Sequence, residues 1–161
     1  MNPLRLVTVY LCSLILGLFL QFMPPPGDGA LFWPSWSMLI LAAWALNMHG
    51  PHLLAALVLG VALDVGFSST LGEHAVVLLL TTYVVMRAAP RLELRAWWQV
   101  ALLLAPLWLG GTFLMMVFDH FTHHEAGISA RWLPVVSEAL LWPIVNRIVA
   151  RLAKPAYPGA V

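Results

Sequence analysis

Six long apolar stretches, separated by proline, glycine or charged residues, constrain this chain more than any other feature. A helix needs about 20 consecutive apolar residues to cross a hydrocarbon core of about 30 Å, so the stretches predict transmembrane helices. Only 9% of the 161 residues are charged, whereas a soluble domain carries about 25%. We therefore predict an all-α integral membrane protein in which residues 1–161 form a single domain, a compact bundle of six transmembrane helices. The predicted spans are residues 6–22, 33–46, 51–69, 74–86, 97–118 and 132–152.

The second and fourth stretches are short for a complete crossing, so a bundle of five helices also remains possible. Prolines predict where helices begin, because a proline in the first turn loses no hydrogen bond. Pro34, Pro51 and Pro134 stand at such positions. Pro106 and Pro143 lie inside predicted spans, where the missing amide predicts a kink.

The basic residues predict how the helices are oriented, because cytoplasmic loops of membrane proteins collect Lys and Arg. With six spans and a cytoplasmic N-terminus, seven of the eight basic residues fall on the cytoplasmic side and only Arg131 falls outside. Five spans would instead separate the basic residues after the fourth stretch from those of the tail. We therefore expect both termini to be cytoplasmic. The seven residues on that side are Arg5, Arg87, Arg91, Arg95, Arg147, Arg151 and Lys154.

Three of these residues, Arg87, Arg91 and Arg95, follow one another at the spacing of one helical turn. Pro90 lies between them and is expected to interrupt a helix, so we do not expect one continuous arginine face. A role in setting the membrane topology explains the positions of these arginines well. Anionic lipid or a cytoplasmic partner could also meet them.

The charge balance and the short connections exclude several classes of protein. Eight basic against seven acidic residues give a net charge of +1, too balanced for a nucleic-acid-binding protein. We expect no extramembrane domain, and phosphate-binding, dinucleotide-binding and zinc-protease motifs do not occur in the sequence. No arrangement of Ser, His and acidic residues stands out, so we expect no enzyme activity and no cofactor; membrane lipids are the expected surroundings.

Two acidic residues, Asp64 and Glu138, fall inside predicted spans, where a charge is costly and therefore a functional candidate. Both are expected in the outer half of the bundle. They could share a proton or a cation. The preferred interpretation is a structural hydrogen bond to a neighbouring helix or to a backbone amide of an outer loop.

Three of the six histidines lie in the predicted outer loop between the fifth and sixth spans. In a helix, Asp119 would face His123 and His120 would face His124, a spacing that zinc ligands use. Loop histidines are common, and we expect no metal here. His52 is expected to help start a helix, and His74 opens the fourth span.

One segment resembles a known family. Gly60 and Asp64 stand four residues apart in the third span, and a Leu-Gly-x-His-Ala turn follows. Together with the Pro-Ser-Trp start of the second span and the arginine-flanked fourth connection, they occur in the order of MreD, the rod shape-determining membrane proteins of bacteria. The matching positions are Gly60, Asp64, Leu71, Gly72, His74 and Ala75.

The resemblance implies a non-enzymatic subunit of the bacterial cytoplasmic membrane that binds MreC. Through MreC it would be linked to MreB, to the glycosyltransferase RodA and to a class B penicillin-binding transpeptidase, and so to lateral peptidoglycan synthesis. The six matching positions are expected to be structural or to face a partner.

The family is similar in fold to the substrate-binding S components of vitamin transporters, so a small-molecule-binding transporter subunit is the alternative. The first span carries Ser13-x-x-x-Gly17 rather than the Ala-x-x-x-Ala pattern by which S components contact their coupling protein, which weighs against transport. Ion conduction by the two acidic residues is a third alternative, but no selectivity filter accompanies it.

Overall fold

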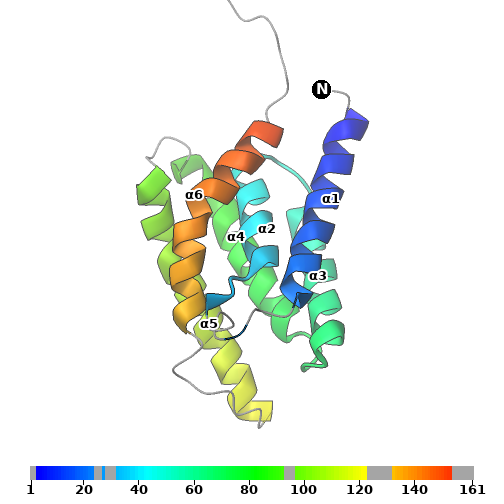
Figure 1. The fold of residues 1–161 in the computed structure, drawn as a ribbon, viewed down its shortest axis with the longest axis vertical. Helices are drawn as coiled ribbons and strands as arrows, with labels where there is room; N and C mark the ends of the chain where they lie inside the picture. Colours follow the sequence, from blue (N-terminus) through cyan, green and yellow to red (C-terminus); the bar gives the residue numbers. More distant parts are fainter. Residues whose placement is uncertain (1–2, 24–26, 28–31, 93–96, 123–131, 154–161) are drawn as a thin grey trace, which may run out of the picture.

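The computed structural model describes residues 3–23, 27, 32–92, 97–122 and 132–153, which form a bundle of six α-helices (Figure 1). The predicted all-α fold with six helices is confirmed. No strand occurs in these residues. The helices are α1 (Pro3–Phe22), α2 (Trp36–Asn47), α3 (His52–Phe67), α4 (Glu73–Leu92), α5 (Trp97–Thr122) and α6 (Leu133–Ala153).

The helices differ in length. Four of them, α1, α4, α5 and α6, are long and apolar enough to cross a membrane. With 12 residues in α2 and 16 in α3, these two helices measure only about 18 Å and about 24 Å at 1.5 Å per residue. The 26 residues of α5 extend over about 39 Å, and Figure 1 shows α5 reaching beyond its neighbours at one end.

The short helix α2 forms the centre of the bundle. It contacts α1, α3, α4 and α6, and nine consecutive residues, 37 to 45, are buried. A helix that is apolar all round is stable only when other apolar groups surround it, which its neighbours provide here. Close packing against α1 depends on Gly17, where an added Cβ would lie 3.0 Å from the Ile40 side chain.

The outward faces of the bundle are aliphatic. On α6, for example, an exposed row recurs every four residues, which suits a surface that meets lipid tails rather than water. Large exposed apolar side chains also cover α1 and α3. The α6 row consists of Val136, Leu140, Ile144, Ile148 and Leu152.

The fourth helix corrects one prediction. Pro90 does not interrupt it, because α4 continues through this proline to Leu92. Pro90 removes one helical hydrogen bond, the one to the carbonyl four residues earlier, and only two residues of α4 follow it, so the interruption displaces little of the helix. Arg87 and Arg91 therefore lie one turn apart on the same helix, while Arg95 lies outside the described residues. Pro106 and Pro143 also lie inside continuous helices.

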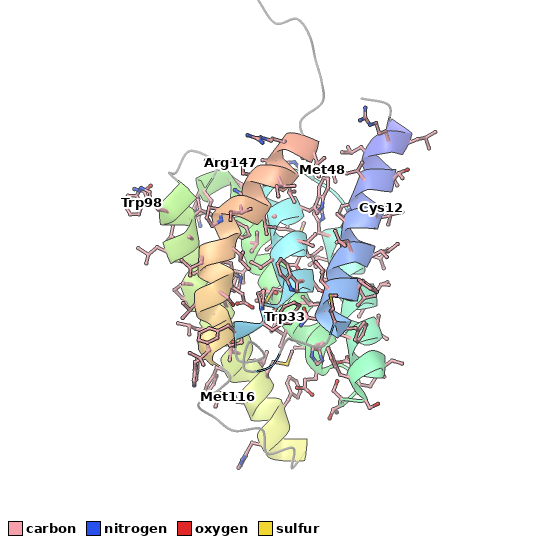
Figure 2. All side chains as sticks on the ribbon, viewed as in Figure 1. Cys12, Trp33, Met48, Trp98, Met116 and Arg147 are labelled. Atoms are coloured by element: carbon pink, nitrogen blue, oxygen red, sulfur yellow. The ribbon has the colours of Figure 1, made fainter. Side chains whose placement is uncertain are left out.

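Because successive helices run in opposite directions, the start of α1 and the ends of α4 and α6 lie at the same end of the bundle (Figure 1). We call this the basic end. Met48, in the connection between α2 and α3, and Arg147 both lie at this end, and Trp33 lies in the opposite half (Figure 2). The described basic residues of these helices are Arg5, Arg87, Arg91, Arg147 and Arg151. Arg131 and Lys154 are not among the described residues.

Candidate functional site

The strongest candidate site is the turn between α3 and α4, at the end opposite the basic end. Asp64, in the last turn of α3, has a completely buried side chain. Its Oδ2 accepts a hydrogen bond from the Gly72 amide at 2.7 Å, and its Oδ1 accepts one from the His74 amide at 2.8 Å. Amides in the first turn of a helix have no partner within that helix and favour a negative charge. Asp64 therefore caps α4 from the neighbouring helix.

The His74 ring completes this arrangement. Its Nδ1 lies 2.9 Å from Asp64 Oδ1. Because the carboxylate accepts, Nδ1 carries the proton, and in the neutral ring Nε2 is then an acceptor. The ring also stacks on Phe67 with a centroid distance of 5.6 Å and an interplanar angle of 27°. Two contacts thus fix both the tautomer and the plane of His74.

Ser69 joins the same cluster and brings together a serine, a histidine and an acid, which the sequence analysis did not anticipate. Its Oγ donates to Asp64 Oδ1 at 3.2 Å and lies 3.3 Å from His74 Nδ1. In a catalytic triad the serine contacts Nε2 while the acid contacts Nδ1. Here both groups lie on the Nδ1 side, so the cluster is not arranged for nucleophilic catalysis.

Backbone conformation explains the glycine of the turn. Gly72 has φ of +103°, a value that L-residues with side chains rarely adopt. No atom lies within 4 Å of where its Cβ would be, so the requirement is conformational rather than steric. Ser68, which ends α3, adopts the left-handed conformation with φ of 52°, and the Ser69 amide donates to the Asp64 carbonyl at 3.0 Å.

Steric contact explains the glycine inside α3. A Cβ on Gly60 would lie 2.2 Å from Ala75 Cα and 2.8 Å from Ala75 Cβ. The small residues at these two positions therefore let α3 and α4 approach closely. That approach brings Asp64, one turn after Gly60, to the start of α4.

Most of the residues selected from the sequence thus belong to one structural unit. Gly60 and Ala75 set the approach of the helices, Asp64 and His74 form the polar cluster, and Gly72 shapes the turn. Leu71 differs, because its side chain is 73% exposed at the tip of the turn. Its role cannot be packing within the described chain.

Glu138 belongs to another site. It is buried in α6, and its Oε1 accepts a hydrogen bond from the Ser35 amide at the start of α2, at 3.0 Å. Its Oε2 has no hydrogen-bond partner among the residues that the structure describes. Asp64 and Glu138 hold different helix starts, and no hydrogen bond joins the two carboxylates in the described part of the chain. This geometry agrees with structural hydrogen bonds rather than a shared proton or cation.

The remaining candidates lie elsewhere. Arg87 and Arg91 lie at the basic end, far along α4 from His74. His123 and His124 of the possible zinc loop are outside the described residues. Among residues 3–23, 27, 32–92, 97–122 and 132–153, no group of three His, Cys, Asp or Glu side chains could hold a metal ion.

A second polar cluster, at the other end of the bundle, escaped the sequence analysis. His52 is the first residue of α3, as expected, but it is completely buried. Its Nδ1 lies 3.0 Å from the Tyr10 hydroxyl and its Nε2 lies 2.8 Å from the Met48 carbonyl. Tyr10, one of the few polar side chains in the first span, was the signal in the sequence that could have indicated a partner.

Comparisons with known proteins show which family the chain is similar to. The family model described as rod shape-determining protein MreD matches residues 4–151. The chain belongs to the MreD family. A rod shape-determining protein MreD of Haemophilus influenzae is 26% identical over 145 residues, which cover 87% of each chain. No solved structure matches.

Membership in the MreD family assigns the chain to rod-shape determination. Together with the four long apolar helices, it identifies a multi-pass membrane protein. The resemblance drawn from the Gly60 to Ala75 segment is confirmed. The similarity to S components stays a prediction.

Proposed function

We propose that the chain is a single transmembrane helical domain that acts as a non-enzymatic scaffold of the bacterial rod complex and binds MreC in the cytoplasmic membrane. The observation that carries this proposal is the MreD family match over residues 4–151, from α1 to the last turn of α6. The role of the family therefore attaches to the whole bundle rather than to one segment of it.

In this proposal the bundle positions the membrane span of MreC, and through MreC it reaches RodA, a class B penicillin-binding transpeptidase and MreB. Lateral peptidoglycan synthesis and rod shape depend on that link. The aliphatic outward faces of α1, α3 and α6 support it, because they can accommodate another apolar helix within the bilayer.

The orientation proposed is that of a protein with both termini in the cytoplasm. Five described arginines lie at the ends of helices that share the basic end, and cytoplasmic loops collect such residues. The α3–α4 turn then faces outward. A non-enzymatic role is supported by the geometry of Ser69 and Asp64, which both contact the same nitrogen of His74.

Affinity purification tests the proposal. The tagged full chain is expressed in a rod-shaped bacterium, extracted in mild detergent and its partners are identified, with an unrelated tagged six-helix membrane protein as control. We expect MreC with the chain and not with the control, and rounded cells when the chain is depleted. A folded chain that captures no MreC would overturn the proposal, and recovery of a bound small molecule with a coupling subunit would support a transporter instead.

A further inference from the structure

His74, at the start of α4, has one ring nitrogen that no described residue contacts by a hydrogen bond. His74 Nδ1 is engaged by Asp64 and Ser69, but no hydrogen bond reaches Nε2 from any described residue. Nε2 is not among the buried side-chain atoms that lack a hydrogen-bond partner. The His74 side chain is 21% exposed. Nε2 is therefore a hydrogen-bond acceptor without a partner among the described residues, on a side chain that is partly exposed.

This acceptor is held in place before any partner arrives. A carboxylate that accepts from one nitrogen of an imidazole fixes the tautomer and the orientation of the ring. On one side the ring is stacked on Phe67, which in turn contacts Phe22 of α1 at a centroid distance of 5.0 Å. A group that is already ordered loses little conformational entropy on binding.

The surroundings of the acceptor are apolar. Phe67 and Phe22 are both partly exposed, and Leu71 projects from the same turn. A single acceptor beside exposed apolar side chains matches an apolar segment that carries one donor. For the neutral ring a lipid phosphate does not match, because it has no proton to donate to Nε2.

We propose that His74 Nε2 accepts a hydrogen bond from a donor side chain on the membrane-spanning segment of a partner protein, which packs on Leu71 and Phe67. This rests on the proposed function, in which MreC is that partner. Asp64 is then a positioning residue, because it acts on the partner only through the ring of His74. The exposure of Leu71 is explained by the same contact.

Two substitutions separate binding from folding. In His74→Asn the side-chain amide can still donate to Asp64, but nothing replaces Nε2; in His74→Gln the amide can reach the position of Nε2 and offer its oxygen. We expect purified MreC to bind His74→Asn about tenfold more weakly than the unmodified chain, which is the effect of one hydrogen bond. Binding to His74→Gln should be partly restored, and His74→Asn should unfold at the same temperature as the unmodified chain.

The outcomes distinguish this inference from the proposed function. If the unmodified chain binds no MreC, the proposed function fails. If the unmodified chain and His74→Asn bind MreC equally, only the role of Nε2 fails. Rescue by Gln and not by Asn would support it, since a merely structural histidine would be served by Asn.

A measurement on the unmodified chain keeps the test decisive if a variant does not fold. With ¹⁵N-labelled histidine, the Nε2 resonance of His74 should move in the direction of hydrogen-bond formation when MreC is added. The same shift on adding phosphatidylethanolamine vesicles without MreC would identify a lipid ammonium as the donor and overturn the assignment to a protein. An unchanged resonance with MreC bound would also overturn it.

Discussion

Two histidines at opposite ends of the bundle are held in opposite ways. His52 is completely buried, and both of its nitrogens have partners inside the protein. Because the Met48 carbonyl can only accept, Nε2 carries the proton and Nδ1 accepts from Tyr10. In His74 the Asp64 carboxylate places the proton on Nδ1 instead, and Nε2 is left over. Both ring nitrogens of His52 thus have hydrogen-bond partners, whereas Nε2 of His74 has none among the described residues.

The difference shows that orientation by a hydrogen bond does not by itself indicate function. Both rings are ordered, and both also contact an aromatic side chain, Tyr10 for His52 and Phe67 for His74. What differs is the number of nitrogens that the fold uses. A polar group that the fold satisfies completely serves stability, while one satisfied only in part can serve recognition.

The largest effect is expected where the backbones meet. Gly60→Ala places a Cβ against the Ala75 backbone, at distances that no side chain can relieve. We expect a loss of about 3 kcal/mol in the free energy of unfolding, measured by denaturation with a harsh detergent. The ¹⁵N resonances of His74 should change while those of His52 stay, which would separate the two ends.

Gly110→Ala is the matched control, because no atom lies within 4 Å of its added Cβ. It should not lower the free energy of unfolding, and should raise it by about 0.5 to 1 kcal/mol because alanine is the better helix former. Equal losses from the two substitutions would contradict the steric explanation of the Gly60 position.

The next effect tests the carboxylate that orients His74. Asp64→Asn removes the charge that accepts from two backbone amides, and should lower the free energy of unfolding by about 2 to 3 kcal/mol. His74 should also lose its fixed tautomer, which the ¹⁵N spectrum reports. Glu138→Gln is the comparison, since it keeps one oxygen for the Ser35 amide and changes an atom without a partner. A larger loss for Glu138→Gln would show that the second carboxylate is the more important one.

A smaller effect is expected from the turn itself. Gly72→Ala forces a side-chain-bearing residue to adopt φ of +103°, which should cost about 1 to 2 kcal/mol of unfolding free energy. The space around the position is open, so the loss can only come from the backbone. Unchanged stability would mean that the turn adopts another conformation in the membrane.

The smallest expected effect tests the difference between His52 and His74. Tyr10→Phe leaves His52 Nδ1 buried without a donor and should cost about 1 kcal/mol of unfolding free energy. Capture of MreC by the folded protein should not change. His74→Asn is expected to show the reverse, weaker capture with unchanged stability. If both variants changed the same property, the distinction between the two histidines would be wrong.

The sequence predicted the number of helices, because proline, glycine and charge separate the apolar stretches. It also selected Asp64, as an intramembrane acid expected to make a structural hydrogen bond, and it selected Gly60, Gly72 and His74 through a family resemblance, without explaining those three. Their physical roles depend on how closely α3 approaches α4, which no local pattern encodes. The contribution of Ser69 was missed for the same reason.

Two other features could not be predicted for different reasons. Membrane helices are apolar on every face, so the central position of α2 has no signature in its periodicity. Pro90 predicted an interruption of the fourth helix. A proline disturbs a helix little when few helical residues follow it, and the end of α4 could not be read from the sequence.

The unequal helix lengths have a consequence for the membrane around the protein. Along α3, whose exposed side is aliphatic, the apolar surface is only about 24 Å tall, while the hydrocarbon core measures about 30 Å. A bilayer accommodates such a short apolar surface by local thinning, and a protein does so by oligomerisation, whereas the longer α5 requires neither. Beside α3, a partner helix with a short apolar span would have the least hydrophobic mismatch.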